Sequence, residues 1–338
     1  MLITILFIIL SLCTLAQSRG ETNRHLLPVL YILLVLIATF RSSETPDYPN
    51  YERLFLTGEF ERGEIGFIAF VTCLRAFFSN AVVIFGAIAV LSVGLKCYAI
   101  RKLSPFIAGS LLIYLSHFFI LHDMIQIRAA IASGVLMIAT KYLFDRDAKR
   151  FFIAATVAVL FHYSALIIFP LWFLRAQKIN KFVYLSMLPA ALLLALKGVT
   201  FGHLASLIPI EAIQSLWSMY EMSMELDIGS EINLFNIMHI IRVGMCMFIL
   251  LFIDKIATSC PMAVIWVKMY TISLVAFWLL SDVPVMSFRI SELYQIIEIL
   301  LIPAVICIPK FSKWGRCLII VFAGCCLFMN IFYNMYVV

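Results

Sequence analysis

Residues 80–99 read NAVVIFGAIAVLSVGLKCYA, a run of 20 residues that contains a single charged side chain, Lys96. About 20 apolar residues is the length that an α-helix needs to cross the hydrocarbon core of a bilayer. A helix is the expected structure, because lipid offers no hydrogen-bond partners to the backbone from outside the segment. This run therefore predicts a transmembrane helix.

Runs of the same kind recur along the chain. The others cover residues 26–40, 65–78, 104–121, 124–144, 151–174, 183–199, 234–253, 261–281, 288–308 and 317–336. Residues 1–16 are also apolar and are followed, not preceded, by basic residues, so we interpret them as a first span rather than a signal peptide. We expect an all-α, polytopic membrane helix bundle with roughly 10–12 transmembrane or re-entrant helices. No repeat or linker appears, so residues 1–338 are treated as one membrane domain.

The composition supports the same class. Of the 338 residues 64% are hydrophobic and 13% are charged, and the mean hydropathy is +1.04, whereas soluble chains are about 45–50% apolar and about 25% charged. A soluble enzyme, a nucleic-acid binder, a disulfide scaffold and a disordered chain are therefore excluded. The nine cysteines show no CxxC spacing, so we expect neither a disulfide framework nor a metal site, and no cofactor.

Charge predicts the orientation of the spans, because cytoplasmic loops are rich in Lys and Arg. The basic clusters assigned to the cytoplasm are Arg19/Arg24, Lys96/Arg101/Lys102, Lys141/Arg146/Lys149/Arg150, Arg175/Lys178/Lys181, Lys255/Lys268 and Lys310/Lys313/Arg316. Acidic residues gather in 41–64 and 201–233, the two expected external loops. Residues 151–174 have basic clusters at both ends, which favours a helical hairpin turning near His162. Residues 65–78 are expected to form an amphipathic or re-entrant helix.

Four arginines lie within apolar segments: Arg75, Arg128, Arg242 and Arg289. An ionisable residue inside a span is a candidate functional residue because its insertion is costly. A guanidinium suits a phosphate or pyrophosphate, since its donors form a planar fork and its charge cannot be titrated away. The alternatives are that Arg128 pairs with Asp123 or a neighbouring carboxylate, and that Arg289 snorkels to the interface or pairs with an acidic residue.

Two further features are candidates for proton transfer. Asp47 lies in the stretch Glu44–Glu52, which combines carboxylates, tyrosines and prolines, and His162 interrupts an apolar run. A carboxylate or an imidazole can accept the proton of an attacking hydroxyl. The alternatives are an ordinary polar loop and a hydrogen-bonded, packed histidine. Asp145-Arg146-Asp147 spells the DxD of metal-dependent sugar transferases, but we interpret it as a helix end because no nucleotide-binding domain surrounds it.

Several of these positions, taken in order, resemble the EpsG-type polysaccharide polymerases. The matching segments are Asp47-Tyr48-Pro49-Asn50-Tyr51 with Phe55, Glu64-Ile65-Gly66-Phe67, Gln126 to Ala132, Ala158 to Phe169 and Phe288-Arg289-Ile290. They span about residues 40–305, and their order is more specific than any one of them. The chain departs from the pattern at Ala129, where Gln is commoner.

The resemblance implies a Wzy-like polymerase of O-antigen or capsule repeat units in the bacterial inner membrane, with its active site facing the periplasm. Such an enzyme joins undecaprenyl-pyrophosphate-linked glycans. Asp47, His162 and Arg128 are the implied catalytic residues, with Asp47 before His162 as the base. The expected substrate-binding residues are Arg128, Arg289, Gln126, Arg75, Arg242 and Tyr51. The expected partners are the lipid-linked glycans, the bilayer and a chain-length regulator, and no nucleic acid.

Three other classes share some of these features. A flippase for lipid-linked sugars would also place arginines in a cavity, although it should show internal repeats. An O-antigen ligase or a sugar O-acyltransferase is a related membrane enzyme. A structural membrane subunit would leave the arginines within spans unexplained.

Overall fold

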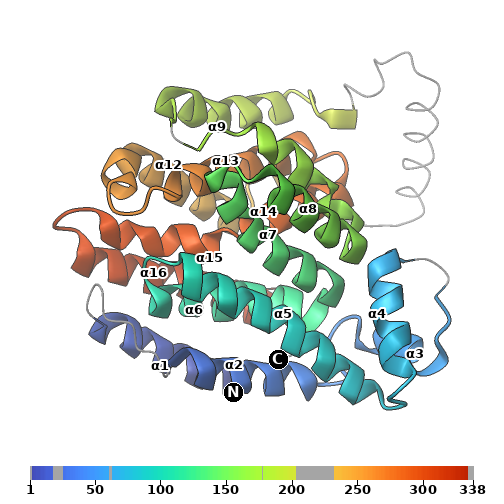
Figure 1. The fold of residues 1–338 in the computed structure, drawn as a ribbon. Helices are drawn as coiled ribbons and strands as arrows, with labels where there is room; N and C mark the ends of the chain where they lie inside the picture. The colour runs from blue at the N-terminus through green and yellow to red at the C-terminus, as the bar shows by residue number, and fades with distance from the viewer. Residues whose placement is uncertain (1, 18–25, 61–62, 177, 203–231, 334–338) are drawn as a thin grey trace. The chain divides into compact units, whose positions relative to one another are not determined.

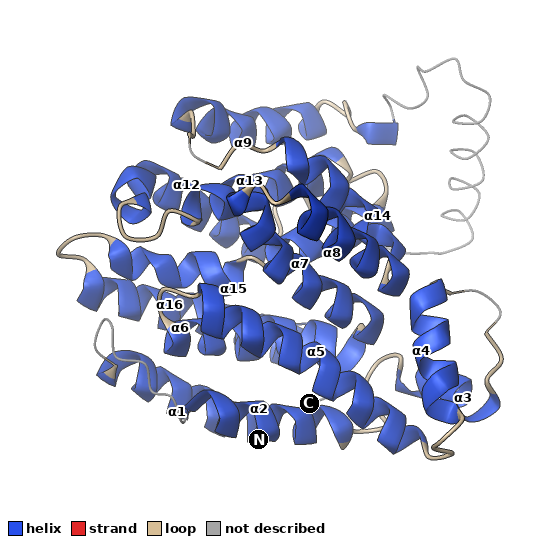
Figure 2. Ribbon diagram, in the orientation of Figure 1, coloured by secondary structure: helices blue, strands red, loops and turns tan. Residues whose placement is uncertain are grey.

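The computed structural model describes the chain except for residues 1, 18–25, 61–62, 177, 203–231 and 334–338. Every regular element within the described part is a helix (Figures 1 and 2). This confirms the predicted all-α membrane bundle. Most of the expected loop 201–233 lies outside the described residues.

Six helices among the described residues are long and apolar enough to cross a membrane. They are α5 (Ala81–Leu103), α6 with η1 (Ile107–Ile125), α7 (Ile127–Asp145), α12 (Ile237–Ala257), the run of α14, α15 and η3 (Pro284–Cys307), and α16 with part of η4 (Ser312–Phe332). Shorter apolar helices are α1 (Leu2–Ala16), α2 (Leu26–Thr39), α4 (Ile65–Arg75), η2 (Tyr163–Phe173), α9 (Lys181–Leu196) and α13 (Ala263–Leu279).

Large apolar side chains remain exposed along these helices. Leu12 of α1 is 61% exposed, Leu36 of α2 is 47% exposed and Phe182 of α9 is 82% exposed. Exposed apolar surface on this scale is unfavourable in water. It is explained by contact with lipid, so the chain is a multi-pass membrane protein.

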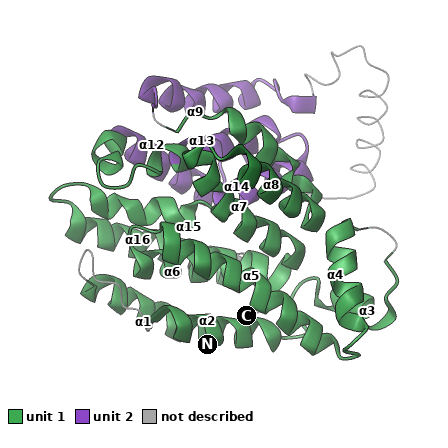
Figure 3. Ribbon diagram, viewed as in Figure 1, with its two compact units in different colours: residues 1–177, 252–266, 296–338 green, residues 178–251, 267–295 purple. Residues whose placement is uncertain are grey.

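The chain forms two compact units, each described by itself (Figure 3). Unit 1 contains residues 1–177, 252–266 and 296–338, and unit 2 contains residues 178–251 and 267–295. The absence of a repeat or linker in the sequence predicts a single domain over residues 1–338. In the structure the two units alternate along the chain.

Helix α7 occupies the centre of unit 1, where it packs against α5 and against α8 (Ala148–Phe161). Its face of small residues allows the close approach that the sequence predicts. A Cβ on Gly134 would lie 2.8 Å from the Cβ of Leu95 on α5. The α7 face is buried as a consequence, and Ala130, Ala132 and Ser133 are 0% exposed.

Helices α8 and η2 form the hairpin predicted for residues 151–174. α8 ends at Phe161, His162 is extended (φ −158°, ψ 113°), and η2 begins at Tyr163. At the other end of the hairpin, Arg146 donates to the carbonyl oxygens of Trp172 (2.6 Å) and Leu174 (2.7 Å). Arg146 is itself the left-handed residue that ends α7 (φ 58°), so the Asp145-Arg146-Asp147 stretch is a helix end, as expected.

Residues 41–64, expected as an external loop, contain a helix, α3 (Tyr48–Thr57). Pro49 near its start is compatible with a first helical turn, where the missing N–H has no partner to lose. Phe55 anchors the helix because its side chain, 1% exposed, stacks edge-on against Phe85 of α5. The 11 residues of α4 follow after a short connection, and they are too few to cross a bilayer.

Gly58 ends α3 with a positive φ of 74°, which suits glycine. A Cβ there would also overlap the Nη1 of Arg75. The Arg75 guanidinium occupies this space and donates to the carbonyl oxygens of Phe55 (2.7 Å) and Leu56 (3.0 Å). α3 and the end of α4 are therefore bound together.

One orientation assignment from the sequence is wrong. Lys96 was placed in a cytoplasmic basic cluster, but it lies inside the bundle on α5, 0% exposed, and pairs with Asp123. Its charge is neutralised within the protein, so it is not a topological signal. Arg101 and Lys102 in the last turn of α5 keep that role.

Candidate functional site

Glu64, the residue before α4, lies at the centre of a polar cluster in unit 1. Its Oε2 accepts a hydrogen bond from Nη1 of Arg128 at 2.7 Å, and its Oε1 lies 3.2 Å from Nδ1 of His162. An ionised carboxylate only accepts, so the imidazole donates through Nδ1. One carboxylate therefore joins the first turn of α7 to the break between α8 and η2.

Gly66 explains how Glu64 reaches His162. A Cβ on Gly66 would lie 2.7 Å from the Cβ of Leu160 and 2.8 Å from its carbonyl oxygen. The missing side chain lets the start of α4 pack directly against the end of α8. Glu64 precedes this contact by two residues and His162 follows it by two, so the close approach brings the pair together.

Arg128 keeps part of its binding capacity free. Its Nε donates to the hydroxyl of Tyr51 at 3.3 Å, and its Nη1 donates to Glu64. A guanidinium has five N–H donors, so the two hydrogen bonds leave most of the fork unused. The side chain of Arg128 is 37% exposed, whereas that of Glu64 is 5% exposed. The guanidinium of Arg128 is therefore partly exposed, while the carboxylate of Glu64 that binds it is buried.

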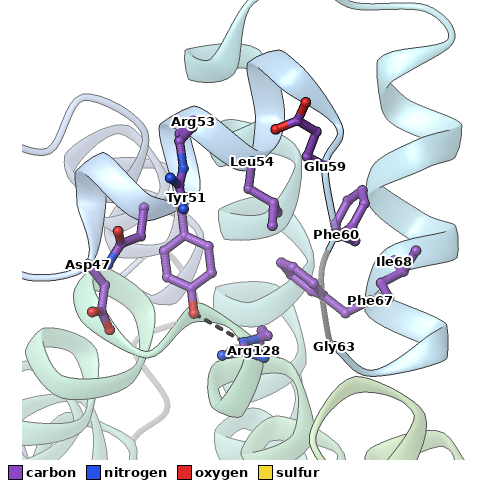
Figure 4. A pocket seen from close by; sticks show the side chains of 11 residues that line it. Asp47, Tyr51, Arg53, Leu54, Glu59, Phe60, Gly63, Phe67, Ile68 and Arg128 are labelled. Atoms are coloured by element: carbon purple, nitrogen blue, oxygen red, sulfur yellow. Dashed lines mark hydrogen bonds between the residues drawn. The ribbon is translucent and has the colours of Figure 1, made fainter.

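A pocket of about 340 Å³ adjoins the guanidinium. Figure 4 shows the phenol of Tyr51 reaching toward Arg128, with Asp47 and Arg53 from the same stretch of chain near it. The lining residues are Asp47, Asn50, Tyr51, Arg53, Leu54, Glu59, Phe60, Gly63, Phe67, Ile68 and Arg128. Carboxylates and amides beside aromatic rings suit a sugar, and the arginines suit an anion.

Asp47 contributes a carboxylate that the helix does not use. It is the N-cap residue of α3, but its side chain makes no capping hydrogen bond. Its backbone is in the left-handed region (φ 63°), which asparagine and aspartate adopt more readily than other non-glycine residues. The carboxylate is exposed at the pocket.

The electrostatics of the cluster keep Glu64 ionised. Burial by itself raises the pKa of Glu64, but the hydrogen bond from His162 and the charge of Arg128 outweigh it, and the pKa is held at about 2. Burial is also the largest cause that raises the pKa of Tyr51, against the lowering effect of Arg128. Tyr51 is therefore a neutral hydroxyl beside a charged guanidinium.

The remaining predicted binding residues in unit 1 lie elsewhere. Arg75 does not line the pocket, and its hydrogen bonds to Phe55 and Leu56 join α4 to the end of α3. Gln126 lies at the junction between η1 and α7, two residues before Arg128, and does not line the pocket either.

Arg242 and Arg289 belong to unit 2. Arg242 lies on α12 and is 9% exposed. Arg289 lies on α14 (Pro284–Gln295) and is exposed. The structure brings together Asp47, Tyr51, Arg128 and His162 through unit 1 alone.

Sequence reasoning did not assign a role to Glu64 or Arg53. Glu64 appeared only as one of several acidic loop residues and as part of the resemblance. Its spacing from Gly66 was the available signal, because a glycine at a helix start marks a possible close contact. Arg53 carried no signal, since it is one of many loop charges. Within the described ranges, no group of three or more His, Cys, Asp or Glu residues could hold a metal ion.

The fold and the site define an integral membrane helix bundle that holds an arginine, a carboxylate and a histidine beside a polar pocket. The chain belongs to the EpsG family, whose family model matches residues 24–337. This is a family of Wzy-like, polymerase-type membrane proteins, so the chain is a polysaccharide-polymerase-like membrane protein. No curated protein and no solved structure matched the chain.

Proposed function

We propose that the chain is a glycosyltransferase that polymerises a bacterial surface polysaccharide, O-antigen or capsule, from undecaprenyl-pyrophosphate-linked repeat units. The observation that carries the proposal is the partly exposed guanidinium of Arg128, held by Glu64 beside a pocket that also contains Asp47. Family membership supports a polysaccharide as the product. The residues that line the pocket support binding of an anion and of a sugar.

The reaction joins two sugars with loss of the lipid carrier. A hydroxyl of the acceptor sugar attacks the anomeric carbon of the donor, the bond from that carbon to the pyrophosphate oxygen breaks, and undecaprenyl pyrophosphate leaves with the electron pair. Arg128 binds the pyrophosphate and stabilises the charge that develops on it. Arg53 adds a second positive charge to the same pocket.

The proton of the attacking hydroxyl goes to Asp47. Asp47 lines the pocket with Arg128, whereas His162 is not among the lining residues. His162 instead donates to Glu64 and helps to hold the carboxylate that positions Arg128. His162 therefore acts as a positioning residue in this scheme.

The charge pattern supports an active site on the periplasmic side of the inner membrane. Arg128 lies in the first turn of α7, and Lys141 and Arg146 lie in its last turns and at its end. Lys149 and Arg150 begin α8, and His162 follows its end. The site thus lies at the helix ends opposite the basic clusters, and the positive-inside rule assigns those clusters to the cytoplasm.

Deletion of the gene in its host tests the proposal, with the surface glycan examined on a gel. Loss of a polymerase leaves acceptors that carry a single repeat unit. Loss of a flippase or a ligase leaves no repeat attached, and an unchanged ladder with altered acylation identifies an acyltransferase. Either of these results would refute the proposal.

Complementation with variants then tests the site. Arg128→Ala should restore only the single-repeat pattern at normal membrane abundance. Arg150→Ala is the matched control, because Arg150 pairs with Asp147 on the surface and its side chain is 69% exposed. The control should restore the full ladder.

A further inference from the structure

A buried ion pair lies at the junction from which α7, the helix of Arg128, begins. Lys96 of α5 donates through Nζ to Asp123 Oδ1 at 2.9 Å and to the carbonyl oxygen of Ala130 at 2.9 Å. Tyr114 donates to Asp123 Oδ2 at 2.8 Å. The side chains of Lys96 and Asp123 are both 0% exposed. Four residues from α5, η1 and α7 therefore form one closed polar group inside the bundle.

Stability alone does not explain this pair. Removing two charges from solvent costs several kcal/mol per ion, and apolar residues of similar volume are often as stabilising or more so. The hydrocarbon surroundings of a span make isolated charges costly as well. A buried pair of this kind is best explained by the geometry that it fixes.

The geometry concerns the junction between η1 (Tyr114–Ile125) and α7. η1 is a π-helix, and at Gln126 the chain leaves helical geometry (φ −89°, ψ 61°) before α7 begins at Ile127. Asp123 precedes the junction by three residues and Ala130 follows it by four. One ammonium group thus bonds to both sides of the break, and Arg128 lies between the two bonded points.

A second basic residue holds the same junction. Arg41, 7% exposed, donates through Nη1 to the carbonyl oxygen of Met124 at 2.5 Å and through Nε to that of Ala38 at 2.8 Å. Behind the junction, Gly134 leaves α7 in close contact with Leu95 and Lys96 of α5. The end of η1 is therefore tied to the end of α2, and α7 is tied to α5.

The geometry points to the Lys96–Asp123 pair as the positioning device of Arg128. The pair sets the angle at which α7 leaves the junction. That angle fixes the position of the Arg128 guanidinium relative to the bound pyrophosphate. Loss of the pair should misplace Arg128 without removing it. This inference rests on the proposed function for its effect on polymerisation, but not for its effect on local structure.

The test variant is Lys96→Met with Asp123→Asn. It removes both charges together, leaves no unpaired buried charge, and keeps an acceptor for Tyr114. The matched control is Lys141→Met with Asp145→Asn, an exposed Lys–Asp pair on α7, whose side chains are 45% and 42% exposed. Both double variants leave the net charge unchanged. Lys96→Arg is a second test variant that keeps the charge but not the geometry.

Two measurements on the purified full-length protein separate positioning from function. The first is hydrogen–deuterium exchange, in which residues 126–130 should exchange at least about tenfold faster in the test variant, as expected from the loss of charged hydrogen bonds. The second is the rise in melting temperature as inorganic pyrophosphate is added, which gives a Kd for pyrophosphate. The affinity of the test variant should be about tenfold weaker than that of the wild type. Neither value should change in the control variant.

The cellular ladder completes the test. The test variant and Lys96→Arg should shorten the polymer at normal membrane abundance, and the control should not. Unchanged exchange at 126–130 in Lys96→Met/Asp123→Asn and Lys96→Arg would overturn the positioning inference whatever the activity. If wild-type protein gives no pyrophosphate-dependent shift, the role of Arg128 in the proposed function fails, and faster exchange in the variants still supports the positioning of α7.

Discussion

The contact at Gly66 gives the sharpest prediction about the site. In Gly66→Ala the added Cβ would lie 2.7 Å from the Cβ of Leu160, whereas ordinary contact begins at 3.4 Å. Because Leu160 also presents its backbone oxygen at 2.8 Å, a side-chain rotation cannot relieve the clash. α4 and α8 must separate by about 0.7 Å, the difference between those two Cβ distances.

This shift is small for the fold but large for the site. Overpacking of this size costs about 1–3 kcal/mol, and the higher helix propensity of alanine offsets about 1 kcal/mol of that. A displacement of the same size along the Glu64–His162 hydrogen bond would lengthen it from 3.2 Å to about 3.9 Å, beyond hydrogen-bond range. Misplacement on the order of 1 Å can reduce a catalytic rate on the order of 100-fold.

The expected result is a protein that accumulates in the membrane but polymerises about 10- to 100-fold more slowly, as the rate effect of misplacement implies. The assay is the glycan ladder of the complemented deletion strain, with membrane abundance and melting temperature in detergent measured in parallel. Gly244→Ala is the control, because a Cβ at Gly244 of α12 meets nothing within 4 Å. A wild-type ladder from Gly66→Ala would refute the claim that this contact assembles the site.

Three further outcomes follow from the same cluster. Arg128→Lys should retain part of the polymer ladder and Arg128→Ala almost none, because an ammonium supplies charge without the planar fork. Asp47→Asn should lower the rate of polymerisation on the order of 100-fold at unchanged abundance, the usual contribution of a general base, and full activity would exclude Asp47 as the base. Because the folded-state pKa of Glu64 is lowered to about 2, its contribution to stability is complete above pH 4.5 and is lost as the pH falls toward 2. The difference in melting temperature between wild type and Glu64→Gln should therefore shrink as the pH falls from 4.5 toward 2.

Local patterns predicted much of the fold. The apolar runs become helices because each helix satisfies its own backbone in lipid, so no partner segment needs to be known. His162 ends α8 where polar residues interrupt the run, and the hairpin follows from the basic clusters at its two ends. The failure was at Lys96, and the helix α3 within residues 41–64 was not predicted. A charge near the end of an apolar run looks like a topological signal, and only Asp123, 27 residues away, reveals that it is buried.

The candidate site was predicted in part. Arg128, His162, Asp47 and Tyr51 stood out because each is a polar residue in an unusual place. Glu64 did not, because a carboxylate in a polar loop is ordinary until its partners are known. Its partners are 64 and 98 residues away along the chain.

By itself the sequence determined that this protein is a membrane helix bundle with arginines where lipid disfavours them, because hydropathy and charge act residue by residue. Only the tertiary structure decided that Glu64 is the carboxylate that binds Arg128, and that Lys96 is buried in a pair with Asp123. Those pairings depend on how closely the helices approach, which Gly66 and Gly134 allow where any larger side chain would hold them apart.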